Sequence, residues 1–360
     1  MTQDGGTYGF GSIFELSKNS SGKWTQTVLH SFTGLTDGNN YFPYTNENSL
    51  IFDKAGNLYG TTPQGGTGGG VGLGVVFKLS PGSNGNWNFS VLYSFKGGKT
   101  DGDVPSGPLA FDPQGDLYGT TTFGGNQSSN SCQATCGVVF RLSPSASGWA
   151  EKIVHLFTSV NEGANRSNGC GVVYRLSPNS NGSWTQATLY SFTCGADGGG
   201  PEGALVLDAA GNLYGTTPIG GTGSACGYGC GVVFELAPSS AVPWNETVIY
   251  DFPSSSTGAY PESKLTFDKA GNLYGTTNGG GDAPSQFCDQ GCGTVFELTP
   301  SSSGWQEKTL YNFTGPLADG AQPEAGVILD SSGNIYGTTR VGGIDGYDYQ
   351  YGGTVYKIVP

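Results

Sequence analysis

Short apolar runs alternate with turn residues along the whole chain. The stretch Ser49–Phe95 shows the pattern clearly, with runs at Leu50–Asp53, Leu58–Thr62, Val75–Leu79 and Ser90–Phe95. The runs are rich in Val, Phe, Tyr and Thr, and Gly, Asn or Pro stands between them, which is typical of short β-strands joined by turns. We therefore predict four strands here, named a to d in chain order, and no segment shows a convincing helical period.

The same pattern returns about every 60 residues, a period typical of one supersecondary unit used repeatedly. The phrase Asp-x-x-Gly-Asn/Asp-Leu/Ile-Tyr-Gly-Thr-Thr occurs five times, starting at Asp53, Asp112, Asp208, Asp268 and Asp330. The phrase Gly-x-Val/Ile-Phe/Tyr-x-Leu/Ile occurs seven times, starting at Gly11, Gly74, Gly137, Gly171, Gly231, Gly293 and Gly353. Repeated four-stranded antiparallel units predict an all-β fold, a β-propeller.

The repeats predict a single propeller domain over residues 1–360. Complete sets of strands cover about 49–95, 108–157, 204–252 and 264–313. A partial unit at 171–192 holds only strands c and d, as if about 28 residues of the repeat were missing. The chain starts with c and d strands at 11–33 and ends with a, b and c at 326–358. Joining these ends would complete a fifth blade and close the ring without a free sheet edge, giving about five complete blades and one incomplete blade.

Composition and charge limit the partners. The chain has 64 Gly among 360 residues and only 12% charged residues, but its 19 Phe, 19 Tyr and 6 Trp argue for a packed fold rather than a disordered one. The net charge of −13 repels polyanions, so we expect no binding to nucleic acid. No apolar run reaches the length of about 18 residues that a spanning helix needs, so we expect no membrane insertion.

The eight cysteines predict disulfides. Three pairs read Cys-x-x-x-Cys-Gly directly before a strand c, and the remaining two cysteines are left to each other. The predicted pairs are Cys132–Cys136, Cys226–Cys230, Cys288–Cys292 and Cys170–Cys194. This usage indicates an oxidising, extracellular compartment. Metal binding is the alternative, but no His lies near any of these cysteines.

Four phrases in fixed order carry a family resemblance. Leu-Tyr-Gly-Thr-Thr, Gly-Gly, Gly-Val-Val-Phe-x-Leu and Leu-Tyr-x-Phe resemble the tandem repeat called GloVer (Gloeo–Verruco) of bacterial secreted and surface proteins. The resemblance covers nearly the whole chain. It implies an extracellular, propeller-like protein, often joined to a surface anchor, and it implies no reaction and no catalytic residues.

Blade topology separates two loop faces. The a–b and c–d loops share one face, and the six Trp of the c–d loops are expected to pack between blades rather than form a ligand platform: Trp24, Trp87, Trp149, Trp184, Trp244 and Trp305. The b–c and d–a loops share the other face, where tyrosines mixed with acids suit a sugar. The predicted ligand residues are Tyr41, Tyr44, Tyr228, Tyr260, Tyr347, Tyr349, Tyr351, Asp197 and Asp319. The alternative is that these are ordinary loop residues, some packing on neighbouring blades.

Catalytic and metal chemistry have weaker candidates. Glu202, Glu262 and Glu324 each follow a Pro just before strand a, and a converging pair could hydrolyse a glycosidic bond. Their recurrence also fits a role in the blade itself. Calcium is a weak alternative at Asp345 and Asp348, and we expect no other cofactor. The five repeated aspartates are expected to bond the N–H groups of their own turns.

Histidine chemistry is not expected. His30 and His155 both replace the Tyr of Leu-Tyr-x-Phe in strand d, so they are interpreted as structural substitutions. Taken together, the sequence favours an extracellular, lectin-like glycan-binding propeller that is not an enzyme. The alternatives are a glycoside hydrolase or polysaccharide lyase with carboxylates on the same face, and a structural or adhesive surface protein.

Overall fold

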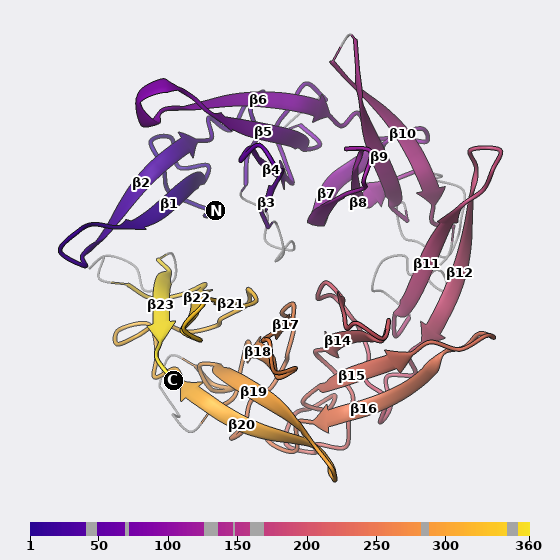
Figure 1. Ribbon diagram of the computed structural model, residues 1–360, viewed down its shortest axis with the longest axis vertical. Helices are drawn as coiled ribbons and strands as arrows, with labels where there is room; N and C mark the ends of the chain where they lie inside the picture. The colour runs from indigo at the N-terminus through magenta and orange to yellow at the C-terminus, as the bar shows by residue number, and fades with distance from the viewer. Residues whose placement is uncertain are drawn as a thin grey trace. The chain divides into compact units, whose positions relative to one another are not determined.

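The structure is a computed structural model that describes residues 1–40, 49–68, 72–125, 136–146, 148–158, 169–281, 288–343 and 352–360. Over these residues it is built from β-strands, with one 3₁₀ turn at Ser83–Gly85 (Figure 1). Eight residues named above lie outside the described ranges: Tyr41, Tyr44, Cys132, Asp345, Tyr347, Asp348, Tyr349 and Tyr351.

The chain divides into two compact units. Unit 1 comprises Met1–Ser167 with Ser177–Gln186, and unit 2 comprises Asn168–Leu176 with Ala187–Pro360. The single domain and the ring closed by both chain ends stay predictions.

Unit 1 contains one hairpin sheet and two complete blades. Each blade is a four-stranded antiparallel meander whose strands are neighbours in chain order. The strands are β1 (Ser12–Lys18), β2 (Trp24–Ser31), β3 (Ile51–Phe52), β4 (Leu58–Thr62), β5 (Val75–Pro81), β6 (Trp87–Ser94), β7 (Gly102–Phe111), β8 (Leu117–Gly124), β9 (Val138–Ser145) and β10 (Gly148–Leu156). The sheet β3–β6 lies within the set predicted at 49–95, and the sheet β7–β10 overlaps the set predicted at 108–157 but begins earlier, at Gly102.

The partial unit forms a two-stranded sheet, β11 (Val172–Pro178) with β12 (Trp184–Ser191). Unit 2 then holds two complete blades and a three-stranded sheet. Their strands are β13 (Val206–Leu207), β14 (Leu213–Thr217), β15 (Val232–Ala237), β16 (Asn245–Asp251), β17 (Thr266–Phe267), β18 (Leu273–Thr277), β19 (Thr294–Ser301), β20 (Gly304–Asn312), β21 (Ile328–Leu329), β22 (Ile335–Thr339) and β23 (Thr354–Ile358). The repeated antiparallel sheets confirm the predicted class, an all-β fold made of propeller blades.

The glycine of Leu-Tyr-Gly-Thr-Thr is required by packing across the sheet. Gly119 on β8 pairs with Phe140 on β9, and a Cβ on Gly119 would lie 2.5 Å from the Phe140 ring and 2.8 Å from Leu109. Gly60 faces Phe77 in the same way, at 2.6 Å. The buried strand-c phenylalanine therefore lies directly over a glycine, which explains why the motif places Gly between Tyr and Thr.

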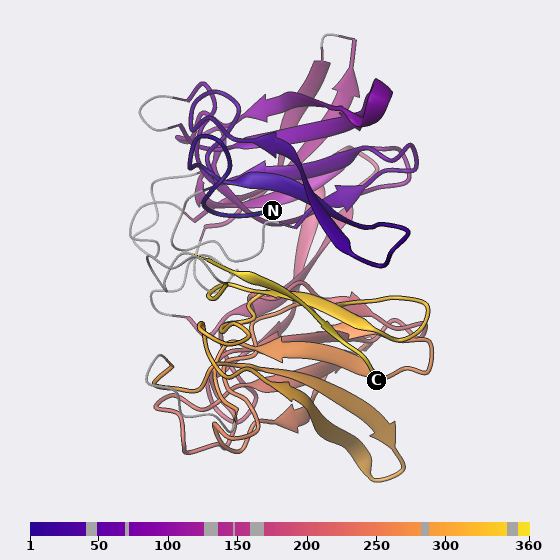
Figure 2. The ribbon, with the colours of Figure 1, turned by 90° about the vertical axis from the view of Figure 1, so that its left-hand side faces the viewer.

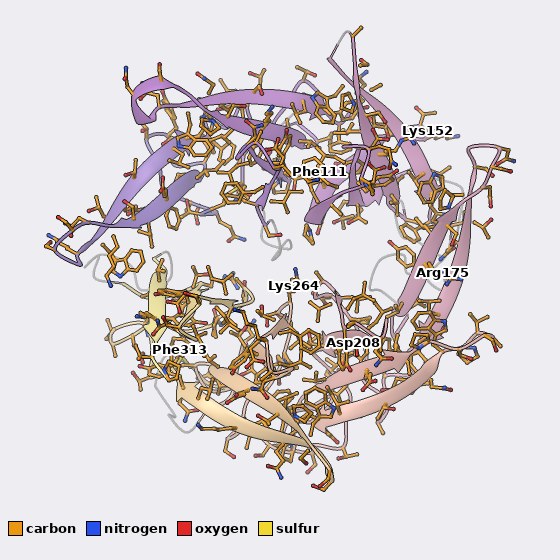
Figure 3. All side chains as sticks on the ribbon, viewed as in Figure 1. Phe111, Lys152, Arg175, Asp208, Lys264 and Phe313 are labelled. Carbon is orange, nitrogen blue, oxygen red and sulfur yellow. A yellow bond between two sulfur atoms is a disulfide. The ribbon has the colours of Figure 1, made fainter. Side chains whose placement is uncertain are left out.

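Neighbouring sheets within each unit pack through aromatic rings. A strand-d phenylalanine of one sheet meets a strand-c aromatic residue of the next, with ring centroids 5.0 to 5.6 Å apart. The pairs are Phe32–Phe77, Phe95–Phe140, Phe192–Phe234, Phe252–Phe296 and Phe313–Tyr356. Figure 3 shows Phe313 among the packed side chains of its unit, and Phe111 on strand a with Lys152 on the outer strand of the same sheet.

The repeated aspartates hold their own a–b turns, as predicted. Asp53 Oδ1 accepts hydrogen bonds from the N–H groups of Ala55 and Asn57, both at 2.9 Å, and its Oδ2 accepts one from the Tyr59 hydroxyl at 3.0 Å. The same bonds recur at Asp112, Asp208, Asp268 and Asp330. Each turn thus locks strand b to the start of its blade.

Loop positions follow from the meander. Because adjacent strands run antiparallel, strand b joins strand c at one end of a sheet and strand c joins strand d at the other. The β19–β20 hairpin, coloured orange, reaches the lower right of Figure 2. The b–c loops therefore leave each sheet at one end and the c–d turns at the other.

Candidate functional site

A pocket of about 510 Å³ opens in unit 2 beside the b–c loop that joins β14 to β15. One wall is Cys194 from the loop after β12, and the rest comes from the b–c loop itself. The lining residues are Cys194, Ile219, Gly220, Gly221, Gly223, Ser224, Cys226, Gly227, Tyr228 and Gly229. Five of these ten residues are glycine, which lets a ligand approach peptide groups closely.

Tyr228 is the prominent side chain of this pocket, with 84% of its surface exposed. The loop backbone is fixed by hydrogen bonds from Gly220 N to Tyr228 O (2.8 Å) and from Gly229 N to Cys226 O (3.1 Å). Gly229 has φ +81°, and a Cβ there would lie 2.1 Å from the carbonyl oxygen of Gly220. The backbone is thus closely packed, and the phenol side chain points into solvent.

Two disulfides stiffen the walls of the pocket. Cys226–Cys230 closes the loop that carries Tyr228, and Cys170–Cys194 ties the opposite wall to the residues before β11. Cys194 adopts φ +59°, and its N–H donates to Gly198 O at 3.0 Å. The pocket is preformed, which lowers the ordering cost of binding a ligand.

Two of the predicted glutamates come together in unit 2. The amide Nδ2 of Asn278, just after β18, donates to Glu262 Oε2 at 3.3 Å and to Glu324 Oε1 at 3.4 Å. Arg340, just after β22, forms an ion pair with Glu324 at 3.0 Å. The Glu324 side chain is 10% exposed, and burial raises its pKa while Arg340 lowers it and Glu262 raises it.

The third glutamate has different surroundings. Glu202 precedes strand a at the same repeat position, but Pro218 occupies the place that Asn278 has in the next sheet. A proline side chain cannot donate a hydrogen bond, so Pro218 cannot bond Glu202 as Asn278 bonds Glu262. The convergence expected from the sequence is therefore seen for Glu262 and Glu324 through Asn278.

Asp197 and Asp319 accept hydrogen bonds within their own loops. Asp319 accepts bonds from the Tyr311 hydroxyl (2.6 Å) and from Thr314 N (2.9 Å) and Oγ1 (2.8 Å). Asp197 does the same for Tyr190 (3.1 Å) and Thr193. Both carboxylates therefore join strand d to the loop that follows it.

Tyr260 is half-buried and packs against the core of unit 2. It adopts φ +60°, and its backbone bonds to Cys230 O and Asn278 N. Of the predicted ligand tyrosines that the structure describes, Tyr228 is the one that reaches solvent fully.

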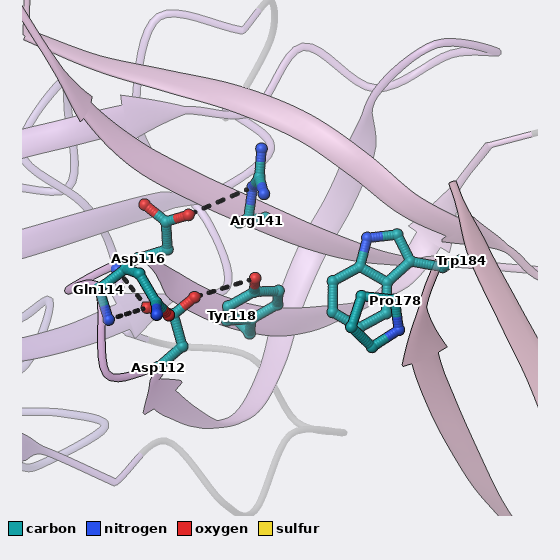
Figure 4. A pocket seen from close by; sticks show the side chains of 7 residues that line it. All are labelled: Asp112, Gln114, Asp116, Tyr118, Arg141, Pro178 and Trp184. Atoms are coloured by element: carbon teal, nitrogen blue, oxygen red, sulfur yellow. Dashed lines mark hydrogen bonds and ion pairs between the residues drawn. The ribbon is translucent and has the colours of Figure 1, made fainter. Parts of the chain in front are cut away.

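A second pocket, of about 500 Å³, lies in unit 1 at the other loop face (Figure 4). It is lined by Asp112, Gln114, Asp116, Tyr118, Arg141, Pro178 and Trp184. The sequence reasoning assigned no ligand here, because the Trp residues of this face were expected to pack between blades. The available signal was the turn Asp112–Asp116, which departs from the other four copies at two positions.

The sequence profile of the Gloeobacter/Verrucomicrobia repeat matches residues 1–169 and 158–356. The chain belongs to this repeat family. Comparison with curated proteins finds no significant match.

Comparison with solved structures finds matches of low similarity. They include a gluconolactonase from Xanthomonas campestris (13% identity, TM-score 0.36, 82% of this chain and 71% of that chain). An α-L-arabinofuranosidase from Lactobacillus brevis has 9% identity and a TM-score of 0.41, over 87% of this chain and 90% of that chain. The catalytic domain of a GH62 α-L-arabinofuranosidase from Coprinopsis cinerea has 12% identity and a TM-score of 0.36, over 86% and 88%. Similarities of this size do not indicate an activity for this chain.

In this Gloeobacter/Verrucomicrobia repeat protein the cysteine prediction is largely confirmed. The pairs Cys170–Cys194, Cys226–Cys230 and Cys288–Cys292 are disulfides. Cys136 is also disulfide-bonded, and its predicted partner Cys132 lies outside the described residues. Among the residues that the structure describes, no group of three or more His, Cys, Asp or Glu is placed to hold a metal ion. The same residues include no helix long and apolar enough to cross a membrane.

The repeated aromatic residues lie largely where the sequence predicts. Trp87, Trp149, Trp244 and Trp305 pack against hydrophobic clusters, and Trp184 packs on Tyr118. Trp24 is 44% exposed, and the Lys18 ammonium lies 5.7 Å from its ring centroid. His30 replaces the strand-d Tyr structurally: its ring stacks on Phe89 at 3.9 Å, and its Nε2 lies 3.1 Å from Asp37, where other copies bond a Tyr hydroxyl.

Proposed function

We propose that this protein binds extracellular glycan through the Tyr228 pocket of unit 2. The observation that carries the proposal is the 84% exposed Tyr228 ring beside a pocket of about 510 Å³. An exposed aromatic ring on a fixed loop can stack on the C–H face of a sugar, while nearby peptide groups and a hydroxyl such as Ser224 bond the sugar hydroxyls.

Charge and disulfides support the same reading. The net charge of −13 favours neutral glycans over polyanionic ones. The disulfides around the pocket suit an oxidising compartment outside the cell, where polysaccharides are abundant ligands.

Replacement of Tyr228 by Ala tests the proposal. The side chain is exposed, so the variant should keep its melting temperature and lose retention on the polysaccharides that bind the parent by about tenfold in affinity. Tyr8→Ala is the matched control, because Tyr8 is also exposed (58%) and lines neither pocket. Undiminished retention of Tyr228→Ala would exclude this pocket as the glycan site.

A glycoside hydrolase is the second candidate, and the Asn278 bridge is the observation that favours it. Glu262 Oε2 and Glu324 Oε1 lie 3.3 and 3.4 Å from one nitrogen, so these oxygens are at most about 7 Å apart, an upper bound that agrees with the spacing of about 5 to 5.5 Å in retaining glycosidases. Glu324, whose pKa burial raises, would be the proton donor, and Glu262 would be the nucleophile or base.

Release of reducing or unsaturated ends separates the two candidates. Polysaccharide that is bound without release supports the lectin. Release that is lost in Glu324→Gln, at unchanged melting temperature, supports the hydrolase. A protein that neither retains nor cleaves any polysaccharide of a plant, algal and bacterial panel would be a structural or adhesive surface protein.

A further inference from the structure

The interface between two complete blades is filled by a strand-a side chain. In unit 1, Tyr59 of strand b meets Phe111 of the next strand a edge to face at 5.0 Å and Trp149 at 6.4 Å. In unit 2, Tyr214 meets Phe267 at 5.2 Å and Trp305 at 6.0 Å. In both interfaces the strand-b Tyr therefore meets two rings of the next blade, the strand-a phenylalanine and the strand-d tryptophan.

The interface at Tyr118 lacks this phenylalanine. Tyr118 meets Trp184 edge to face at 5.8 Å, as Tyr59 meets Trp149. However, the sequence between β10 and β11 contains no copy of the strand-a and strand-b phrases, so no residue corresponds to Phe111. The pocket of about 500 Å³ lies against Tyr118 and Trp184 (Figure 4). Among the described residues, none takes the place beside Tyr118 that Phe111 takes beside Tyr59.

The polar wall of this pocket departs from the repeat. In the other four turns the fifth residue is Asn, whose amide donates to the turn Asp at 2.7 to 2.8 Å. Here the fifth residue is Asp116, whose carboxylate faces Arg141 at 3.5 Å. The third residue, Ala or Ser elsewhere, is Gln114. The turn therefore differs from the other copies at Gln114 and Asp116, two residues that line the pocket.

The guanidinium of Arg141 at this pocket has one N–H donor without a hydrogen bond. Its Nε is buried without a hydrogen-bond partner, since the Asp116 oxygen lies 3.5 Å away. A buried donor without a partner costs free energy that an oxygen-bearing ligand would recover. The opposite charges of Asp116 and Arg141 also offset each other, and the third charged group, Asp112, already accepts hydrogen bonds from its own turn and from Tyr118, which favours a ligand without net charge.

We propose that this pocket binds one residue of a neutral saccharide, as a site separate from the Tyr228 pocket. The apolar face of the sugar ring would take the place of the missing phenylalanine against Tyr118, Trp184 and Pro178. Its hydroxyls would bond Gln114, Asp116 and Arg141. A phenylalanine side chain of a partner peptide fits the chemistry less well, because it would desolvate these three polar groups without bonding them.

The site belongs to unit 1 and does not depend on Tyr228, so the two proposals can fail separately. The incomplete unit at 171–192 then has a role, which is to leave one interface open for ligand.

Restoring the repeated turn sequence tests this proposal. The double variant Gln114→Ala, Asp116→Asn carries the residues that fold in other copies, so it should keep the melting temperature of the parent. Binding of neutral gluco-, manno-, galacto- and arabino-oligosaccharides is followed by the indole N–H signal of Trp184, assigned with Trp184→Phe. We expect oligosaccharide to shift this signal in the parent and in Tyr228→Ala, and the affinity to fall about tenfold in the double variant.

Three results would overturn the proposal. One is that no oligosaccharide shifts the Trp184 signal of the parent. Another is that the double variant binds as tightly as the parent. The third is that a phenylalanine-containing peptide shifts the signal while oligosaccharides do not. Loss of binding in Tyr228→Ala at an unchanged Trp184 response would instead concern the unit 2 pocket alone.

Discussion

The ring of Tyr118 meets the indole of Trp184 edge to face, with centroids 5.8 Å apart. The same relationship joins Tyr59 to Trp149, but there Phe111 packs on the Tyr ring as well. The contact between the strand-b Tyr and the next Trp thus occurs once with an adjacent strand-a phenylalanine and once without it. The two versions allow packing and binding roles of the repeated Trp to be separated by experiment.

We expect Trp149→Ala to destabilise the protein more than Trp184→Ala. Removing Trp149 leaves a cavity beside Tyr59 and Phe111, at a cost of about 2–3 kcal/mol, whereas Trp184 already borders an open pocket and its loss should cost about 1 kcal/mol. Urea unfolding of both variants measures the difference. Equal losses would mean that the Tyr118 interface is packed as tightly as the Tyr59 interface.

Gly119→Ala should destabilise the fold by about 3 kcal/mol, because the added Cβ would lie 2.5 Å from the buried Phe140 ring. Gly115→Ala in the preceding turn is the control: nothing lies within 4 Å of a Cβ there, and only its φ of +90° opposes a side chain. We expect a cost of about 1 kcal/mol for the control. A smaller effect at Gly119 than at Gly115 would contradict the packing explanation of the motif.

The repeat pattern was sufficient to predict the strands, because each blade uses the same short apolar runs and the same turn. The predicted sets match the sheets β3–β6, β7–β10, β13–β16 and β17–β20, and the partial unit matches β11–β12. The turn aspartates were also predictable, since a short carboxylate before Gly-Asn bonds the nearest N–H groups. The repeat period and the local chemistry of the turns were therefore sufficient to predict the strands and their order.

Side-chain direction in the loops was not predictable in the same way. Tyr228 and Tyr260 both lie in irregular loops, yet one is exposed and the other packs on the core with φ +60°. Asp197 resembled a ligand carboxylate in sequence, but in the structure it accepts a hydrogen bond from the hydroxyl of Tyr190, seven residues earlier. These outcomes depend on contacts between segments that a single repeat unit does not contain.

The open pocket could have been suspected from the sequence. Gln114 and Asp116 are departures within a turn that is otherwise nearly constant, next to the one unit that lacks strands a and b. The missing step was geometric, because only the structure shows that Trp184 of the short unit faces Tyr118 of the preceding blade.

Asp319→Asn distinguishes a structural role from a ligand role. The carboxylate accepts three hydrogen bonds from Tyr311 and Thr314, so the variant should lose about 1–3 kcal/mol of unfolding free energy. Glycan binding by the folded variant should stay within twofold of the parent, which is about 0.4 kcal/mol. A large loss of binding at unchanged stability would instead make Asp319 a ligand residue, as the sequence first suggested.

Two half-buried glutamates, Glu151 and Glu246, should make the fold more stable in mild acid. Burial and the nearby Asp101 raise the pKa of Glu151 to about 7, with Lys96 opposing, and burial and Asp197 raise the pKa of Glu246 to about 7. The Oε1 atom of each is buried without a hydrogen-bond partner, which also favours a neutral carboxyl.

The direction of the pH effect follows from proton uptake. Between about pH 4.3 and 7 the folded chain keeps protons on Glu151 and Glu246 that the unfolded chain has released. The contribution of these groups is therefore fully present below about pH 4.3 and is lost as the pH rises to 7. Glu151→Gln removes the charge that the folded state disfavours. At pH 8 it should raise the unfolding free energy by about 1 kcal/mol, a value reduced for the partial exposure of the group.

Urea unfolding at pH 4.5 and pH 8 measures this effect for Glu151→Gln, Glu246→Gln and the exposed Glu15→Gln as control. The turn aspartates contribute the opposite slope, because their hydrogen bonds lower their pKa in the fold, as at Asp53 and Asp208. That contribution is common to all variants, so the difference from the parent isolates each glutamate. We expect the unfolding free energy at pH 8 to rise in Glu151→Gln and Glu246→Gln and not in Glu15→Gln. A loss there would mean that Glu151 and Glu246 are charged and stabilising in the folded protein.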